Sequence, residues 1–545
     1  MKDFTYFHCY TEDLWPGYEK SGLLRRRFGI RFPQSIDLPE SQKFNALAAR
    51  GGRLHSLVKE TRCGFYIDRL QGGSFMQDYV YDRALIDEYE NLLDDDFLGF
   101  QMHEWLSNYK SDLEKLEDLP AEAWTKENIE AAIYKQFPYP HVFLEAMTAE
   151  EMAAAGKPRN MREFYRNMTE IYCRRAQDYR LLPCDSGFIM FPFEAEHGAR
   201  AIMPEVGAQT PDMRVQMCYA RGVCRAYGMT FGAYYEPWGG HPFSCCTYLP
   251  DGKNEWNIGG GTFPFSPGGP NGGSSRSLQW RVHLYAYLSG ARFISEEWGG
   301  YNTFCDLETY ELSEYGKVKK KFLDFIERYP DLGDKVAPVA VVLPNDLPSY
   351  TVWWKSPPDD PCLFGYELTG AERERYLRMR RGAAKVFSDA LPKLGDEKKT
   401  LIHSDVPDAA DMLNEGDGHA LGDYRYLVDL TGAPTFAKRH DNCILPEQVG
   451  DVLRDLLPCV VEGGLHYLLN RRGRDGYYLT VFNHGGVCRS QAGGETVLPE
   501  ADKTVAITLK AGRTLKALEG SKAVTYENGR YYVTLHGGDW FFAAI

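Results

Sequence analysis

Short apolar segments alternate with stretches of helical periodicity along residues 1–330, and this alternation constrains the fold more than any other feature. Strand–helix repeats build parallel sheets, because a parallel pair of strands needs a crossover connection. Eight such strands predict a closed (β/α)8 TIM barrel of the α/β class. The expected strands are Phe4–Cys9, Phe28–Phe32, Gly64–Asp68, Phe97–His103, Arg180–Cys184, Arg200–Pro204, Met229–Tyr235 and Ala291–Ser295.

Helical patterns fill the segments between these strands. A charged stretch around 110–180 has apolar positions every three or four residues and predicts a helical insertion in the barrel. Further helices are expected at Thr210–Tyr227, at Ser274–Leu288 and at Ser313–Tyr329. A long Gly-rich segment follows the seventh strand, and loops of that length in compact domains are usually functional.

The rest of the chain predicts two more domains, since 545 residues are too many for one core. We expect the barrel to occupy 1–335, a small α/β domain 336–463, and an antiparallel β-sandwich 464–545. The α/β domain begins with the apolar run APVAVVLP and contains a helix at Glu372–Leu391, the strand-like runs TLIHSDV and YRYLVDL, and a helix at Glu447–Cys459. Short runs such as YYLTVFN, TVAITL, KALEG and AVTYE predict the sandwich.

Polar side chains follow several predicted strands at their carboxyl ends, where barrel enzymes carry their active sites. Four separate strands deliver glutamates to this end of the barrel, a fifth ends in Asp68, and aromatic residues stand beside most of the glutamates. Since strand residues alternate in direction, only one of Glu296 and Glu297 can face the mouth, and we take Glu297 as the candidate. The candidate site residues are Asp68, Arg69, His103, Glu104, Trp105, Glu205, Glu236, Trp238, Glu297 and Trp298.

This inventory suits glycoside hydrolysis. One carboxyl group protonates the leaving oxygen, and a second stabilises or attacks the anomeric carbon. Aromatic planes beside them can hold the apolar face of a sugar ring. Each residue also has a structural interpretation, as an ion-pair partner or as a plug of the barrel rim. The convergence of four strand ends on one mouth favours the catalytic interpretation.

Other classes lack their signatures. The sequence has no phosphate-binding G-x-x-x-x-G-K-[ST] loop, no strand-linked G-x-G-x-x-G, no H-E-x-x-H and no G-x-S-x-G, so no cofactor is expected. A net charge of -14 without a basic patch argues against nucleic acid. No apolar run approaches the roughly 18 residues of a membrane span. The start MKDFTYFHCY lacks a signal-peptide core, and 13 cysteines stand without framework spacing, so we expect a cytoplasmic protein.

The domain order and the region around the seventh strand resemble clan A of the glycoside hydrolases, in particular the family 42 β-galactosidases and their relatives. Glu236-Pro237-Trp238 is followed by a Gly-rich loop and then by SSRSLQWRVHLYAYLSGARFISEEW, which is similar to the nucleophile region of that group. The resemblance implies a retaining, exo-acting enzyme with Glu236 as nucleophile and Glu104 as acid/base. It also implies a homo-oligomer, a trimer or dimer, through the small α/β domain.

The sequence departs from this family at one point. The acid/base of clan A usually follows an asparagine, whereas Glu104 follows His103; His103 or Asn108 could replace that contact to the sugar. A second arrangement is open, in which Glu205 and Glu297 are the working pair and Glu236 binds substrate. Two other functions also stay open: a non-catalytic carbohydrate-binding barrel, and a metal-dependent lyase or isomerase with ligands such as His8, Asp68, His103 and Glu205.

Overall fold

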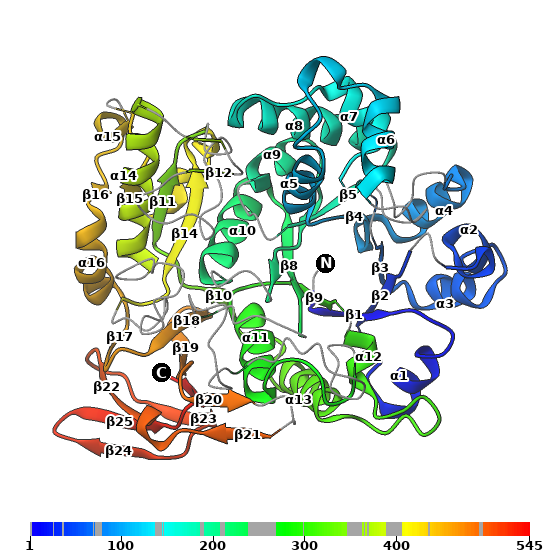
Figure 1. The fold of residues 1–545 in the computed structure, drawn as a ribbon. Coiled ribbons are helices and arrows are strands. Elements are labelled where there is room, and N and C mark those ends of the chain that lie inside the picture. The colour runs from blue at the N-terminus through cyan, green and yellow to red at the C-terminus, as the bar shows by residue number, and fades with distance from the viewer. Residues whose placement is uncertain are drawn as a thin grey trace.

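One parallel sheet organises the first part of the computed structural model (Figure 1). The structure describes residues 3–25, 27–34, 38–68, 70, 79–136, 144, 146–185, 190–207, 213–237, 243, 255, 269–297, 299–345, 362–363, 366–367, 370–387, 406–433, 436–489 and 494–545. The strands are β1 (Thr5–Cys9), β2 (Phe28–Phe32), β3 (Gly64–Ile67), β4 (Phe97–His103), β5 (Leu181–Cys184), β6 (Ala201–Ile202), β7 (Glu205–Val206), β8 (Thr230–Tyr235) and β9 (Phe293–Glu296).

The sheet closes on itself, which confirms the predicted barrel. Its order runs β5-β4-β3-β2-β1-β9-β8-β6, and β7 also pairs with β8. The two ends of this path are joined because the Met203 N–H donates to the Pro183 carbonyl at 2.9 Å and the Glu205 N–H donates to the Asp185 carbonyl at 3.2 Å. The sixth predicted strand, Arg200–Pro204, contains β6, and β7 follows beyond its predicted end; Pro204 between them has no N–H to donate. Together they keep one register against β8.

Side chains inside the barrel form layers, as alternation along the strands requires. Apolar and aromatic residues fill its lower and middle part: Phe7, Tyr66, Leu98, Leu182, Cys184, Ala201, Met203, Tyr234 and Phe293. The next inward positions toward the carboxyl ends are polar on several strands. His103 follows Gln101 on β4, Glu205 follows Met203, and Glu236 follows Tyr234. The carboxyl end of the barrel is therefore lined by polar side chains, which lie on top of the apolar and aromatic core.

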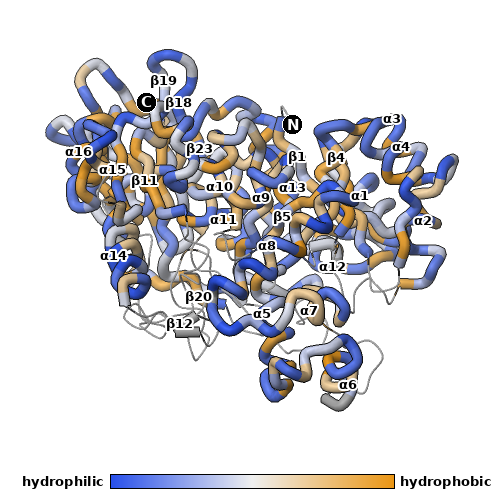
Figure 2. The backbone as a smooth tube through the Cα atoms, turned by 90° about the horizontal axis from the view of Figure 1, so that it is seen from above, coloured by the Kyte–Doolittle hydropathy of each residue, from blue (hydrophilic) through white to orange (hydrophobic). Residues whose placement is uncertain are grey.

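Helices surround the barrel and also fill the segment between β4 and β5, where the insertion was predicted. The outer layer includes α1 (Trp15–Ser21), α3 (Arg53–Thr61), α4 (Arg83–Leu93), α10 (Met213–Tyr227), α11 (Arg276–Leu288) and α13 (Glu314–Arg328). The insertion consists of α5 (Trp105–Lys115), α6 (Lys126–Gln136), α7 (Ala149–Ala155) and α8 (Met161–Asp178), which gather on one side of the barrel in both views (Figures 1 and 2). Apolar segments lie mainly in the interior of the molecule (Figure 2).

A four-stranded parallel sheet follows, in the order β14-β11-β15-β16. Its strands are β11 (Val339–Leu343), β14 (Ala410–Asn414), β15 (Tyr426–Asp429) and β16 (Cys443–Ile444), with helices α14 (Gly370–Phe387), α15 (Phe436–Arg439) and α16 (Val449–Leu456) beside it. Most of the predicted run TLIHSDV lies outside the described residues, and β14 comes after it. The predicted helix at Glu447–Cys459 ends earlier than expected, because Pro458 precedes the new strand β17 (Cys459–Glu462).

Two antiparallel sheets complete the chain and confirm the predicted β-rich end. One has the order β10-β18-β19-β26-β23 and the other β17-β22-β25-β24. Their strands are β10 (Asp334–Lys335), β18 (His466–Arg472), β19 (Gly476–Phe482), β22 (Lys503–Leu509), β23 (Lys516–Gly520), β24 (Val524–Glu527), β25 (Arg530–Leu535) and β26 (Trp540–Ala544). A short hairpin, β20 (Val487–Arg489) with β21 (Glu495–Val497), stands beside them. In the described part of the chain, no helix combines the length and apolarity that a bilayer crossing needs.

Candidate active site

The candidate carboxylates meet around His103 at the mouth of the barrel. One side-chain oxygen from each of Glu104, Glu205 and Glu236 lies within 4.8 Å of the others. The His103 ring approaches Glu205 at 3.7 Å through Nδ1, and Glu104 and Glu297 at 3.8 and 3.7 Å through Nε2. His103 itself is buried and packs edge-on against Tyr234. The structure thus brings together carboxylates from β4, β7, β8 and β9.

Glu104 is held in a left-handed backbone conformation, with φ 44° and ψ 35°, at the turn between β4 and α5. This conformation is uncommon for a residue other than glycine and is kept only where surrounding contacts determine it. The Glu104 N–H donates to the Cys184 carbonyl at 2.8 Å, and the Leu106 N–H donates to the Asp185 carboxylate at 2.7 Å. Asp185 therefore caps the first turn of α5 and locks the turn that carries Glu104.

Asp185 is a functional candidate that the sequence analysis did not single out. It follows β5 directly, so the rule that found the other strand-end carboxylates applies to it equally. Asn108, proposed as a contact to the sugar, instead donates its side-chain amide to the His103 carbonyl at 3.2 Å. Both residues act on the shape of the turn between β4 and α5.

Glu205 lies deepest in the cluster, with 1% of its side chain exposed, whereas Glu104 keeps 25%. Burial raises the pKa of the Glu205 carboxyl well above its ordinary value, and the charges of Glu104 and then Glu236 raise it further. Carboxyl groups this close cannot all be ionised together at neutral pH. The cluster therefore retains a proton at pH values where isolated carboxylates have lost theirs.

Glu236 follows β8 and is fixed by the backbone on both sides. Its N–H donates to the Val206 carbonyl at 2.9 Å, and the Pro237 carbonyl accepts the Ser274 N–H at 2.8 Å. Gly207 lies against it at φ 137°, and a Cβ there would come within 2.8 Å of both Cβ and the carbonyl oxygen of Glu236. Only glycine fits this approach without displacing the carboxylate.

Glu296 and Glu297 point in opposite directions, as strand alternation predicts. Glu297 approaches His103 in the mouth. Glu296 points into the helical layer, where Lys319 lies 2.7 Å from its carboxylate and the Tyr6 and Tyr315 hydroxyls donate to it. Burial by itself would raise the pKa of Glu296, but the Lys319 ammonium and His283 lower it to about 2. Glu296 is therefore ionised at neutral pH and paired with Lys319 outside the mouth.

Asp68 forms a buried ion pair with Arg31, at 2.6 Å between Arg31 Nη2 and Asp68 Oδ2. The Arg31 guanidinium also donates to the Glu296 carbonyl and lies 5.3 Å from the ring centroid of Tyr234. The sequence analysis did not name Arg31 as a candidate site residue, although the period of two along β2 places its side chain inside the barrel. Arg69, the neighbour named with Asp68, lies outside the described residues.

Of the three tryptophans expected near the mouth, Trp105 is the one among the described residues. Trp105 is buried in the helical layer, where its Nε1 donates to the Ala146 carbonyl at 3.3 Å and its ring packs on Tyr172. It presents no open face to a sugar. Trp238 and Trp298 lie outside the described residues.

The residues that could hold a cation are the same three glutamates. Among the described residues, Glu104, Glu205 and Glu236 are the one group of metal-ligating side chains whose ligand atoms lie that close together. An all-oxygen set of this kind suits a hard divalent cation. His8 does not join it: its ring points into the helical layer, stacked on Tyr6, and burial lowers its pKa to about 3.

Comparisons with known proteins give structural neighbours alone. No family model matches the sequence, and no curated protein matches it. One similar solved structure is a family 98 glycoside hydrolase catalytic module from Streptococcus pneumoniae, at 8% identity and a TM-score of 0.43, with 100% of this chain and 98% of that chain covered. Another is a β-galactosidase from Halorubrum lacusprofundi, at 10% identity and a TM-score of 0.38, with 99% of this chain and 98% of that chain covered. A third is an α-L-fucosidase from Paenibacillus thiaminolyticus, at 10% identity and a TM-score of 0.37, with 100% of this chain and 99% of that chain covered. All three are glycoside hydrolases, the class that the sequence resembles, but at these values they assign neither substrate nor site residue to this chain.

Proposed function

We propose that the protein is a retaining glycoside hydrolase that removes a terminal sugar from a glycan or glycoside. One observation carries the proposal: oxygens of Glu104, Glu205 and Glu236 lie within 4.8 Å of one another at the carboxyl end of the barrel. Retaining enzymes place their two carboxyl groups about 5–5.5 Å apart, and inverting enzymes about 6.5–9.5 Å apart to admit a water. The spacing here favours retention. The exo preference rests on the family resemblance.

The environments of the glutamates support different roles. Glu104 is the most exposed and stands on the rim, where a leaving group departs into solvent, so we assign it as acid/base. Glu236 is buried and held by backbone contacts, which suits a nucleophile that must approach the anomeric carbon at a fixed distance. Glu205, whose pKa is raised by burial and by the charges of Glu104 and Glu236, holds the proton of the cluster.

The alternative pair, Glu205 with Glu297, has less support. Burial and the charges of Glu104 and Glu236 raise the pKa of Glu205, so this carboxyl holds a proton and is a poorer nucleophile than an ionised carboxylate. Glu297 flanks His103 and is placed to bind a substrate hydroxyl. The test below separates the two assignments.

The proposal is tested by hydrolysis of a panel of chromogenic α- and β-glycosides. Glu236→Gln is expected to lose several orders of magnitude in kcat, because the covalent route disappears. Glu104→Ala is expected to lose about a hundredfold or more on glycosides with poor leaving groups, and far less on activated ones, which need no proton. The exposed Glu60→Gln variant is the matched control and should keep wild-type rates.

Full activity in both Glu236→Gln and Glu104→Ala would contradict the assignment and move it to Glu205 and Glu297. Binding of a sugar at the mouth without turnover of any substrate would favour a carbohydrate-binding protein.

A cation-dependent reaction is the second candidate, because the three carboxylates form a set of oxygen ligands. Activity that disappears on chelation and returns with a divalent cation would support it. Activity unaffected by chelation would leave the glycosidase proposal.

We also propose the division into three domains at 335/336 and 463/464, and a homo-oligomer formed through the α/β domain. Light scattering on the purified chain measures the oligomeric state. A monomer at micromolar concentration would contradict that part of the proposal.

A further inference from the structure

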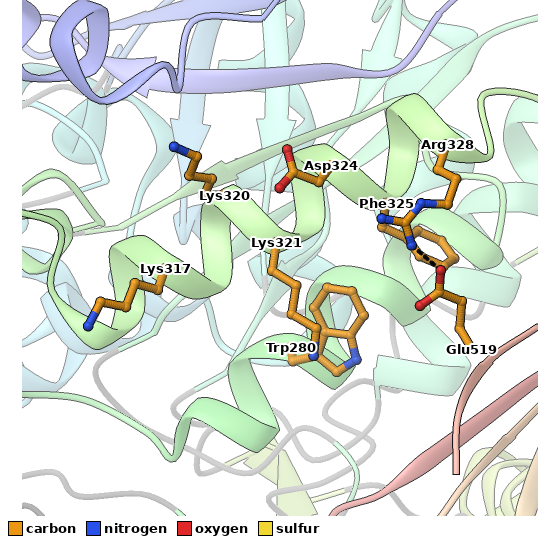
Figure 3. A pocket seen from close by; sticks show the side chains of 8 residues that line it. All are labelled: Trp280, Lys317, Lys320, Lys321, Asp324, Phe325, Arg328 and Glu519. Atoms are coloured by element: carbon orange, nitrogen blue, oxygen red, sulfur yellow. Dashed lines mark hydrogen bonds and ion pairs between the residues drawn. The ribbon is translucent and has the colours of Figure 1, made fainter. Parts of the chain in front are cut away.

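A cleft on the outer face of the barrel, away from the mouth, is lined by an unusual set of side chains. It lies where α11 and α13 meet β23 and encloses about 360 Å³, a volume within the range of ligand pockets. Four cationic and two acidic side chains line it together with two aromatic rings (Figure 3). The lining residues are Trp280, Lys317, Lys320, Lys321, Asp324, Phe325, Arg328 and Glu519.

Both acidic residues of the cleft are already neutralised. Asp324 pairs with Arg25 outside the cleft at 2.5 Å, and Glu519 accepts from Arg328, as the dashed line in Figure 3 marks. Lys317 pairs with Glu314 at 2.5 Å. Lys320 and Lys321 differ from it, since neither has a carboxylate within ion-pair distance in the described part of the chain. The cleft therefore holds an excess of positive charge.

Lys321 is the central residue of this cleft. Its Nζ lies 4.1 Å from the ring centroid of Trp280, over the face of the indole (Figure 3). Burial lowers the pKa of the Lys321 ammonium below its ordinary value, although Glu519 opposes the shift. The Lys321 side chain is nevertheless exposed and has no carboxylate in ion-pair contact among the described residues, so its ammonium is open to pairing with a bound anion.

Trp280 forms an aromatic wall of the cleft. The residue is 5% exposed and its Nε1 is enclosed by protein, so the ring presents its face, and not its N–H, toward the Lys321 ammonium. The cleft thus offers ammonium groups beside an aromatic face, and its acceptors are occupied. That combination favours an anionic oxygen group.

We propose that this cleft is a second binding site of the protein, which takes the sulfate or carboxylate group of an acidic glycan. The anion part rests on the cleft alone, and the glycan part rests on the proposed function. The mouth, with its four glutamates, repels an anionic group, so an acidic glycan needs a separate site for its charge. Beyond the Debye length of about 8 Å, salt screens the net negative charge of the molecule, and the local positive charge dominates.

Isothermal titration with a sulfated dextran oligosaccharide, its uncharged parent and inorganic sulfate tests the site. We expect the wild type to bind the sulfated oligosaccharide more tightly than either other probe. The Lys320→Met/Lys321→Met variant is expected to bind it about tenfold or more weakly, a loss of about 1.4 kcal/mol. Lys59→Met/Lys503→Met removes two exposed lysines elsewhere and is the control with equal charge. Lys321→Arg keeps the charge and is expected to keep binding.

Each outcome is decisive. Equal binding by the wild type and the Lys320→Met/Lys321→Met variant, with both folded by thermal melting, would overturn the site. Inorganic sulfate that binds as tightly as the sulfated oligosaccharide would overturn the glycan part. The measurement needs no turnover, so a protein without glycosidase activity would still give a clear answer for the cleft.

Discussion

At the scale of single residues, the site is an arrangement of like charges that costs stability. Glu205 is enclosed beside Glu104 and Glu236, and its raised pKa records that cost. A surface position would avoid the cost, so the arrangement points to chemistry rather than to folding. Glu296, one residue from Glu297, shows the contrast: it has a cation and hydrogen-bond donors, and its pKa falls to about 2.

Glu205→Gln is expected to stabilise the protein at alkaline pH. Because the folded state binds the Glu205 proton more tightly than the unfolded chain does, its contribution is full below the unfolded pKa and is lost as pH rises toward the raised folded pKa. The loss amounts to about 1.4 kcal/mol for each pH unit in that window. Glutamine does not ionise, so the variant should melt above the wild type at about pH 8, and the difference should vanish near pH 4.

The same substitution is expected to change the pH profile of kcat/KM. Once Glu205 of the wild type ionises at alkaline pH, its charge opposes loss of the acid/base proton; glutamine carries no such charge, so the alkaline limb should move to lower pH. A melting difference independent of pH, together with an unchanged profile, would show that Glu205 does not share the cluster's proton.

At the scale of elements, the barrel and most of the site could be predicted from the sequence. Apolar runs at regular spacing located all eight strands, and the ends of several runs located the candidate carboxylates, because both depend on local pattern; Asp185, after β5, was missed. The alternation of β9 also separated Glu296 from Glu297 correctly. These are the features that a period of two along a strand determines.

Features that depend on distant partners could not be predicted. The left-handed turn at Glu104 depends on Asp185 and Cys184, far along the chain. Trp105 stood beside Glu104 in the sequence, yet the start of α5 turns it into the helical layer. Strand β18 was also not predicted, because the sequence around it has no strict alternation, with five consecutive buried residues from His466 to Asn470.

The turn between β4 and α5 makes a prediction of its own. Asp185→Ala removes the acceptor that caps α5, which should cost about 1 kcal/mol of stability. It should also let Glu104 move, so kcat on glycosides with poor leaving groups should fall more than kcat on activated ones. Asp185→Asn keeps an acceptor oxygen and should retain most activity. Equal losses on both substrate types would mean that Asp185 does not act through Glu104.

At the scale of the whole molecule, buried charges connect the barrel to the later sheets. Gly222 of α10 packs so closely on β14 that a Cβ would lie 2.1 Å from the Met412 carbonyl oxygen, and Arg221 pairs with Asp411 at 2.5 Å. Asp408 accepts the Tyr285 hydroxyl of α11 at 2.6 Å and bonds His466 of β18 at 3.0 Å. The parts are therefore held in one arrangement by specific contacts.

Asp408→Ala is expected to destabilise the protein by about 3–5 kcal/mol, because Lys335 and its neighbours would keep buried charge without a partner. Burial alone would raise the pKa of Asp408, but Lys335 and His466 lower it well below its ordinary value, so the carboxylate is charged throughout the neutral range. Chemical denaturation measures the loss, with the exposed Asp441→Ala as control. Equal stability of the two variants would contradict the role of this network.

The central claim is that Glu236 attacks the anomeric carbon from within a cluster of strand-end glutamates. The most direct measurement is mass spectrometry of the protein after incubation with a fluorinated glycoside that carries a good leaving group, which slows release of the covalent intermediate. The account predicts one sugar per chain, attached to the peptide that contains Glu236, and no label in Glu236→Gln. Label on Glu205 or Glu297, or rapid turnover of an ordinary glycoside with inversion at the anomeric carbon, would contradict it.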